Sequence, residues 1–273
     1  MGWFERQRVT NPAVSSVSAF FPCYNDAYTI ETMVRSVSQA LEVWVEDYEV
    51  IVVDDGSTDG SLEVLVRLAA ELPRLRVVVH DKNRGYGGAL RSGFDAATKD
   101  WIFYTDGDGQ YDPREVARLI RAVKPDTDFA QGWKLQRADG TARTVIGRAY
   151  HRFVARLFSL RVRDTDCDFR LLRRELVERA GLQCDSGAIC VEMMYRFEHA
   201  GARCVETPVH HFARAYGHSE FFRVGHLTRT FADLGRLWLR LRVGIGAERR
   251  ADDIGRRVPA DKAINVAVRD ASS

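Results

Sequence analysis

The sequence contains no long hydrophobic run and few cysteines. No stretch approaches the uninterrupted run of about eighteen apolar residues that a membrane-spanning helix needs. The opening segment MGWFERQRVTNPAVSS does not show the charged and then apolar pattern of a secretory signal. The 5 cysteines are widely spaced and form no CxxC pair, which argues against a disulfide framework and a structural zinc site. We therefore expect a globular protein of the reducing cytoplasm, for which any contact with the inner face of the membrane is peripheral.

The sequence also lacks a large excess of charge of either sign. Forty basic residues stand against 38 acidic ones, a formal net charge of +2, so the composition does not indicate nucleic acid or another polyanion as a partner. The arginines nevertheless concentrate late in the chain. Segment 221–243 combines aromatic residues and leucines with arginines at other positions, which predicts an amphipathic helix. Its apolar face suits either a membrane surface or packing on the domain, and the sequence leaves both open.

The sequence does contain short β-branched or aromatic runs that alternate with longer helical patterns, in a chain long enough for one large domain or two small ones. Apolar strands joined by crossover helices are typical of α/β proteins, in which helices cover both faces of a parallel sheet. We therefore expect an α/β fold. The predicted strands are 17–21, 48–54, 76–80, 101–105, 128–133 and 203–212; the predicted helices begin at Thr29, Ser61, Tyr86 and Pro113 or span about 144–160, 188–201 and 221–243.

Three carboxylates crowd the segment YTDGDGQYDP, residues 104–113. A calcium-binding EF-hand loop that began at Asp106 would need glycine at its sixth position and glutamate at its twelfth, where this sequence has Tyr111 and Ala117. The segment also follows a predicted strand and not a helix, which argues further against an EF-hand. Asp112 precedes a proline suited to the first turn of a helix, and we interpret it as a helix cap.

Polar and acidic residues follow three of the predicted strands, in segments 22–26, 54–60 and 106–110. Ligands of open α/β sheets bind beyond the carboxyl ends of the strands, so we expect these three clusters to converge on one edge. Asp106 and Asp108 alternate along an extended strand end and would repel each other without a cation between them. Mg²⁺ or Mn²⁺ takes one or two protein carboxylates and completes its shell with water and substrate phosphates. We therefore interpret this pair as a metal site.

The glycine-rich segment NRGYGGA, residues 83–89, lacks the spacing of a dinucleotide-binding fingerprint. We interpret it as a turn that another stretch of backbone approaches closely. Contact of phosphate with Arg84 or with the backbone of this turn is the alternative.

Taken together and in this order, FPCYNDAYTIETMV, VIVVDDGSTDGS, NRGYGGALRSGF and DGDGQYDP resemble glycosyltransferase family 2, and more narrowly its dolichol- or polyprenyl-phosphate sugar transferases. The resemblance implies a GT-A fold, which is a Rossmann-like nucleotide-binding sandwich with a mainly parallel, mixed central sheet. It implies an inverting transfer of a hexose from a UDP- or GDP-sugar to polyprenyl (dolichyl) phosphate, with Mg²⁺ or Mn²⁺. We expect one domain over 1–243, with a nucleotide-binding half at about 16–112, an acceptor half at about 113–225, the amphipathic helix at about 221–243, and a polar, loosely held tail at 244–273.

The resemblance also implies three groups of site residues, which would bind the nucleotide, the metal on the diphosphate, and the phosphates of donor and acceptor. A metal and preorganised cations stabilise the charge that develops on a leaving diphosphate. Asp108 and the cations of the third group are therefore the expected catalytic residues, together with Asp168. The groups are, in that order, Pro22, Tyr24, Asp26, Asp54, Asp55 and Asp106; Asp106, Asp108 and Gln110; and Lys134, Arg143 and Arg214.

Three positions depart from the pattern of the mannosyl members of the family. Lys134 stands where they carry arginine, and Glu220 stands where they carry lysine, which weakens the assignment of a lipid-phosphate site. Asp168 stands where a small residue is usual. It would contact the acceptor, act as a base toward a hydroxyl acceptor, or simply pair with Arg170. Two alternatives therefore remain: a soluble hydroxyl acceptor with Asp168 or Glu192 as base, and a nucleotide-sugar-binding module without activity.

Overall fold

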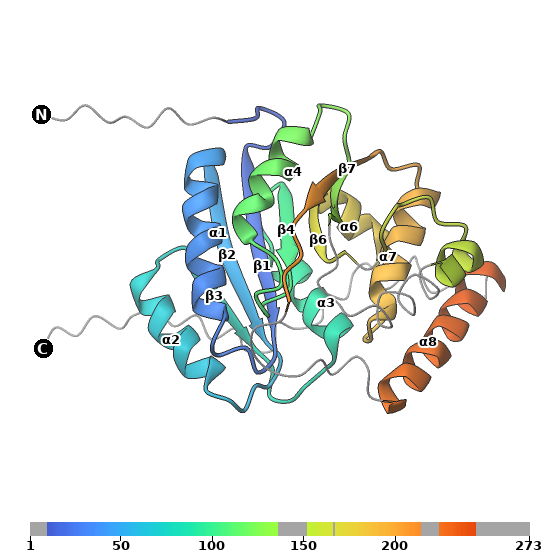
Figure 1. Ribbon diagram of the computed structural model, residues 1–273, viewed down its shortest axis with the longest axis horizontal. Helices are drawn as coiled ribbons and strands as arrows, with labels where there is room; N and C mark the ends of the chain where they lie inside the picture. Colours follow the sequence, from blue (N-terminus) through green and yellow to red (C-terminus); the bar gives the residue numbers. More distant parts are fainter. Residues whose placement is uncertain (1–9, 136–151, 166, 214–223, 244–273) are drawn as a thin grey trace, which may run out of the picture.

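A single seven-stranded sheet runs through the computed structural model, which describes residues 10–135, 152–165, 167–213 and 224–243 (Figure 1). The strand order is β3-β2-β1-β4-β6-β5-β7. β1 lies parallel to β2 and β4, β2 to β3, and β5 to β7, whereas β6 is antiparallel to both of its neighbours. The strands are β1 (Ser16–Cys23), β2 (Asp47–Asp54), β3 (Leu75–Val79), β4 (Trp101–Thr105), β5 (Phe129–Lys134), β6 (Phe169–Arg173) and β7 (Cys204–Val209).

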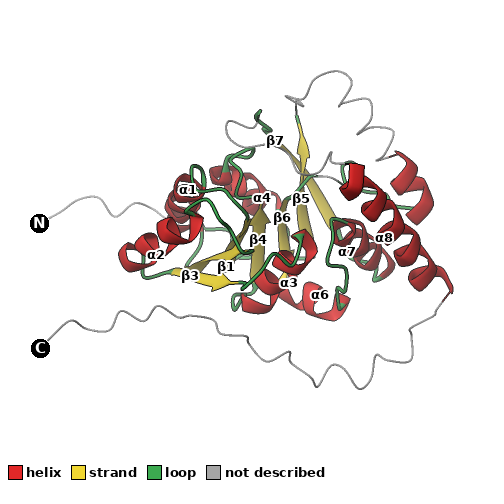
Figure 2. Cartoon of the chain, turned by 90° about the horizontal axis from the view of Figure 1, so that it is seen from below, coloured by secondary structure: helices red, strands yellow, loops and turns green. Residues whose placement is uncertain are grey.

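Helices cover both faces of this sheet, as Figure 2 shows in a view roughly along the strands. α1, α2 and α4 pack on one face, and α3, α6 and α7 pack on the other. The predicted mixed α/β fold is therefore confirmed. The helices are α1 (Ile30–Trp44), α2 (Ser61–Glu71), α3 (Tyr86–Ala96), α4 (Val116–Ala122), α6 (Arg174–Ala180), α7 (Ala188–His199) and α8 (Val224–Val243), with a 3-10 turn at Pro113–Glu115.

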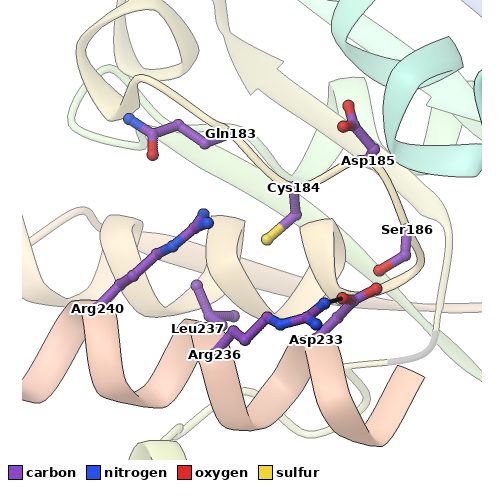
Figure 3. A pocket seen from close by; sticks show the side chains of 8 residues that line it. All are labelled: Gln183, Cys184, Asp185, Ser186, Asp233, Arg236, Leu237 and Arg240. Carbon is purple, nitrogen blue, oxygen red and sulfur yellow. Dashed lines mark hydrogen bonds and ion pairs between the residues drawn. The ribbon is translucent and has the colours of Figure 1, made fainter. Parts of the chain in front are cut away.

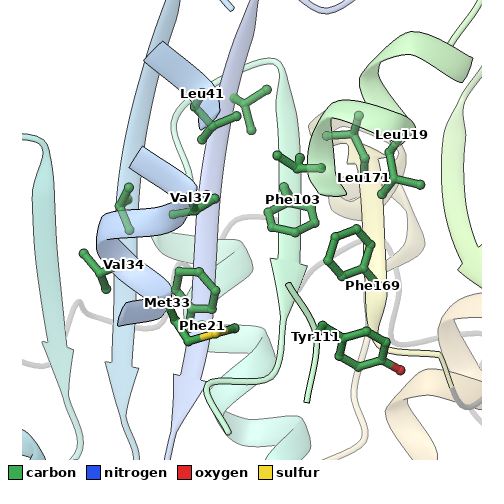
Figure 4. Close-up of a cluster of buried hydrophobic side chains, with 14 of the residues drawn as sticks. Phe21, Met33, Val34, Val37, Leu41, Phe103, Tyr111, Leu119, Phe169 and Leu171 are labelled. Carbon is green, nitrogen blue, oxygen red and sulfur yellow. The ribbon is translucent and has the colours of Figure 1, made fainter. Parts of the chain in front are cut away.

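Apolar side chains that alternate along the strands pack against the helices on both faces of the sheet. Along β1, Phe21 enters the core under α1, and its neighbour Phe20 enters the core under α3, because successive strand side chains point to opposite faces. In Figure 4, Val37 and Leu41 of α1 lie in one apolar layer with Phe103 of β4. All five side chains are fully buried, and burial of a side chain of this size contributes about 1.5–3 kcal/mol.

Two elements were not predicted from the sequence. β6 and α6 follow each other directly, and β6 pairs antiparallel with strands that lie far away in the chain. Of the helix predicted at about 144–160, the structure describes 152–158 as helical. The predicted tail at 244–273 lies outside the described residues.

The described side chains of α8 pack on the domain. Leu234 and Leu237 are 1% and 2% exposed, and they form a third cluster with Phe158 and with Val191 of α7. Of the two alternatives for this helix, packing on the domain accounts for these leucines. No helix within the described ranges is long and apolar enough to cross a membrane.

Candidate active site

The loop after β1 is tied to the loop after β2. Asn25 has a left-handed φ of 59°, a conformation that asparagine tolerates better than most residues. Its backbone N–H donates to Ser57 Oγ at 3.0 Å, and its side-chain Oδ1 accepts from the Thr58 N–H at 2.8 Å. Pro22 is buried, whereas Tyr24 is 41% exposed at the rim. The predicted nucleotide contacts of these two loops therefore lie at one edge of the sheet.

Asp54, the last residue of β2, carries a buried carboxylate with an unsatisfied oxygen. The side chain is 1% exposed, and Oδ1 accepts no hydrogen bond from any residue in the described part of the chain. Burial raises the pKa of Asp54, and hydrogen bonds from Ser57 only partly oppose this rise. A buried oxygen without a donor is costly, so this atom is a candidate for contact with a ligand.

Asp55, by contrast, is bound entirely by protein donors. Its Oδ1 accepts from His80 Nδ1 at 2.6 Å and from the Arg84 N–H at 2.8 Å, and its Oδ2 accepts from the Gly85 N–H at 3.0 Å. The residue is 3% exposed. Its carboxylate therefore organises the glycine-rich turn.

The carboxylate loop after β4 lies against the loop after β1. A side chain on Gly107 would come within 3.0 Å of the Pro22 carbonyl oxygen and 3.4 Å of Asp26 Oδ2. Asp26, in the first polar cluster, thus lies beside the third. The three strand ends converge as the sequence predicted.

Asp106 and Asp108 differ in their partners. Asp106 Oδ1 accepts from the Tyr86 hydroxyl at 2.8 Å, and Asp108 Oδ1 accepts from the Gln110 N–H at 2.9 Å. Removal from water, followed by the negative charges of Asp168 and Asp108, raises the pKa of Asp106 well above its usual range. A divalent cation would relieve this concentration of negative charge.

No group of three histidine, cysteine, aspartate or glutamate side chains suited to one metal ion occurs within the described ranges. An ion at the Asp106–Asp108 pair would therefore need oxygen atoms from a ligand or from water. Gln110 Nε2 donates to the Phe212 carbonyl at 3.2 Å, which leaves Oε1 as the acceptor atom of that amide.

Asp112 is the predicted cap: its Oδ1 accepts from the Arg114 N–H at 3.0 Å at the start of the 3-10 turn.

Asp168 is a third carboxylate beside this pair. Thr105 pairs with Phe169 across β4 and β6, so Asp168 lies opposite Asp106. Its Oδ1 accepts from Arg170 Nη1 at 3.2 Å and from Cys190 Sγ at 3.1 Å, and Oδ2 has no hydrogen bond within the described part of the chain. The predicted pairing with Arg170 is confirmed, and it leaves one oxygen of Asp168 without a partner there.

Glu192 does not share this position. Its Oε2 accepts from the N–H groups of Gln183 and Cys184, each at 2.9 Å, and its Oε1 accepts from Arg196 at 2.7 Å. The residue is 1% exposed. These contacts favour a structural role over that of a base.

The glycine-rich turn is closely approached by the backbone of residues 184–186. A side chain on Gly87 would come within 2.4 Å of the Cys184 carbonyl oxygen. The N–H groups of Gly87 and Gly88 donate to the Asp185 carbonyl at 2.9 and 3.3 Å. These N–H groups, like those of Arg84 and Gly85, already donate hydrogen bonds to oxygen atoms of the protein. The prediction of a close turn is confirmed, and the alternative of phosphate contact with its backbone is not supported.

The predicted cations are only partly described. Lys134 ends β5, beside Val209 of β7. Burial raises the pKa of the Cys167 thiol to about 12, and the Lys134 ammonium works against that rise, so the two side chains are near each other. Arg143, Arg214 and Glu220 lie outside the described residues.

A cavity of about 270 Å³ lies on the other side of the 183–186 turn, between that turn and α8 (Figure 3). Arg236 and Asp233 form an ion pair in its wall at 3.1 Å. None of the predicted site residues that the structure describes lines it. A second hollow, of about 420 Å³, includes Gly109 and Asp112 of the carboxylate loop among its lining residues.

Comparison with known proteins agrees with this fold. The family model for glycosyl transferase family 2 matches residues 18–181. A mannosyltransferase of Pyrobaculum calidifontis, solved with GDP-Man and Mn²⁺, is 24% identical with a TM-score of 0.60; the match covers 81% of this chain and 64% of that one. Glucosyl-3-phosphoglycerate synthase of Mycobacterium tuberculosis, solved with Mn²⁺, UDP and phosphoglyceric acid, is 18% identical with a TM-score of 0.65, over 83% of this chain and 78% of that one. The same synthase was also solved with Mg²⁺ and UDP. These similarities identify the fold as GT-A.

Proposed function

The chain belongs to glycosyl transferase family 2, and we propose that it transfers a hexose from a UDP- or GDP-sugar to polyprenyl phosphate, with inversion and with Mg²⁺ or Mn²⁺. The observation that carries the proposal is the convergence of Asp26, Asp54 and the Asp106–Asp108 pair on one edge of the sheet. The solved neighbours bind nucleotide together with a divalent cation, which supports the same use of this edge.

The nucleotide would bind over β1 and β2. Asp54 Oδ1 is a buried acceptor to which no described residue donates, so a base N–H or a ribose hydroxyl would satisfy it. Tyr24, 41% exposed at the rim, presents a ring on which a base would stack. Pro22 and Asp26 would complete this side, whereas Asp55 would act on the pocket only through the glycine-rich turn.

Asp106, Asp108 and Gln110 would hold the metal. Two carboxylates and an amide oxygen at the end of one strand are the oxygen donors that Mg²⁺ or Mn²⁺ takes, and the negative charges beside Asp106 favour a cation there. A bound Mg²⁺ or Mn²⁺ supplies positive charge to the diphosphate as it leaves. Lys134, Arg143 and Arg214 would add fixed cations around the phosphates of donor and acceptor.

The polyprenyl phosphate acceptor is supported by the order of the sequence motifs and by the concentration of arginines late in the chain. A phosphate oxygen is already anionic, so its attack needs no strong base. Peripheral contact with a membrane stays part of this proposal.

One observation favours a second candidate, transfer to a soluble hydroxyl acceptor. Asp168 adds negative charge opposite Asp106, and its Oδ2 accepts no hydrogen bond in the described part of the chain. That charge would repel a phosphate acceptor, whereas Oδ2 would take the proton of an attacking hydroxyl.

In the experiment, the purified protein is incubated with Mn²⁺ and with UDP-glucose or GDP-mannose that carries a label on the sugar. The acceptor is either a polyprenyl phosphate or a water-soluble compound, phosphorylated or neutral. Label that passes into organic solvent supports the polyprenyl acceptor. Label transferred only to a soluble hydroxyl compound supports the second candidate. Absence of transfer from every donor, combined with metal-dependent nucleotide binding, would instead favour a binding module.

A further inference from the structure

Two neighbouring aspartates at the end of β2 have opposite environments, and Asp55 is the one that the reaction proposed above does not use directly. Its two oxygens accept three hydrogen bonds, from His80 Nδ1 and from the N–H groups of Arg84 and Gly85. With three donors at 2.6–3.0 Å and 3% exposure, this carboxylate is a structural clamp on the start of the glycine-rich turn.

His80 extends the clamp to α3. Its Nδ1 faces the Asp55 carboxylate and therefore carries a proton, and its Nε2 lies 2.8 Å from Ser92 Oγ. The Ser92–His80–Asp55 order is that of a hydrolytic triad. Here, however, His80 is 3% exposed and both ring nitrogens are engaged, so the chain of hydrogen bonds is closed to a substrate. It joins α3 to the end of β2.

The clamped turn carries Tyr86. Gly85 has a φ of +85°, and a side chain there would approach the Asp185 carbonyl oxygen to 2.7 Å. The N–H of Gly87 donates to the same carbonyl at 2.9 Å. Tyr86 is therefore held between Asp55 on one side and Asp185 on the other. From this position its hydroxyl donates to Asp106 Oδ1 at 2.8 Å.

We propose that Tyr86 is a positioning residue for Asp106, and that Asp55, His80 and Ser92 position Tyr86. The hydroxyl of Tyr86 occupies Oδ1 of Asp106 and orients the carboxylate, so that Oδ2 is the oxygen presented to a cation. Partners of this kind tune metal affinity because they orient the ligand before the metal arrives. The inference deepens the proposed function and rests on its assignment of Asp106 to the metal.

The test measures Mn²⁺ binding directly, by titration of the full chain in the presence of UDP and, separately, of GDP. Tyr86→Phe removes only the hydroxyl, and we expect the dissociation constant for Mn²⁺ to rise about 10-fold or more. Tyr48→Phe is the matched control: it also removes one phenol hydroxyl, at the opposite end of β2, and should leave Mn²⁺ binding unchanged.

A cycle of variants tests whether Asp55 acts through Tyr86. Asp55→Asn alone should weaken Mn²⁺ binding, whereas adding it to Tyr86→Phe should weaken binding further by roughly twofold or less, because the contact that it supports is already gone. If Asp55→Asn does not fold, Ser92→Ala takes its place in the cycle. A purely structural role would lower the melting temperature without this dependence on Tyr86.

The outcomes separate this inference from the proposed function. If the wild type binds Mn²⁺ and nucleotide and Tyr86→Phe binds Mn²⁺ with the same affinity, the role of Tyr86 is overturned but the proposed function is not. Wild-type protein that shows no metal-dependent binding of either nucleotide would overturn both. If Asp55→Asn and Tyr86→Phe each weaken Mn²⁺ binding equally and independently, Asp55 does not act through Tyr86. Only the role of Tyr86 toward Asp106 then remains.

Discussion

The unsatisfied oxygen of Asp54 predicts that this residue serves ligand binding at the expense of stability. Asp54→Asn keeps the size of the side chain and removes its charge. Asparagine keeps a buried polar atom but not the buried negative charge, so the gain is relief of the charge penalty that raises the pKa of Asp54. Relief of about 1 kcal/mol raises the melting temperature of a chain of this length by about 2–4 °C. In buffer without nucleotide or metal, we therefore expect Asp54→Asn to raise the melting temperature by about 2–4 °C or more.

The pH dependence of this gain has a definite sign. Burial raises the pKa of Asp54 in the folded protein above its unfolded value, so the folded state is penalised only while the group is charged. The penalty is present above the raised pKa and is relieved as the pH falls through it toward the unfolded value. The difference in melting temperature between wild type and Asp54→Asn should therefore shrink as the solution is acidified.

The same change should weaken nucleotide binding. A hydrogen bond to a charged acceptor contributes about 1.5–3 kcal/mol, so the dissociation constant for UDP or GDP, measured by calorimetry, should rise about 10- to 150-fold.

Asp59 provides a matched control in the neighbouring loop. Burial opposes its ionisation, but hydrogen bonds from Ser61 and from the Ala27 N–H outweigh that effect and lower its pKa. Asp59→Asn should therefore lower the melting temperature. A fall in melting temperature for Asp54→Asn, or a rise for Asp59→Asn, would contradict the opposite environments assigned to these two carboxylates.

Three further predictions follow from the contacts of the site and its supports. Asp108→Ala should abolish sugar transfer, as measured by release of nucleoside diphosphate, while the circular dichroism spectrum stays that of the wild type; retained turnover would remove its metal role. Gly87→Ala should destabilise the fold by about 1–3 kcal/mol through overpacking against the Cys184 carbonyl, whereas Gly187→Ala, with no atom within 4 Å, should not. Glu192→Ala should lower the free energy of unfolding, measured with denaturant, by about 3–5 kcal/mol because it leaves Arg196 without its partner. A decrease below about 1 kcal/mol, the value typical of exposed pairs, would contradict the assignment of a buried ion pair.

The fold was predictable where each strand carries its own local signal. β1, β2 and β4 are apolar runs buried on both faces, and α1 has a helical period of its own, so short windows of sequence were enough to identify them. β6 has only five residues and is defined by antiparallel pairing with β4 and β5. Such pairing depends on residues tens of positions away, and no short window contains it.

The candidate site divides in the same way. Acidic residues follow strand ends in the sequence, and the carboxyl ends of parallel strands share one edge of a sheet. These two facts were enough to predict the convergence of Asp54 with the Asp106–Asp108 pair. Asp54 and Asp55 are adjacent and chemically identical. The folded chain distinguishes them: among the described residues, one carboxylate keeps an oxygen without a partner, and the other accepts hydrogen bonds from residues more than twenty positions later. Hydrogen bonds to distant donors, and not residue type, set the role of a carboxylate.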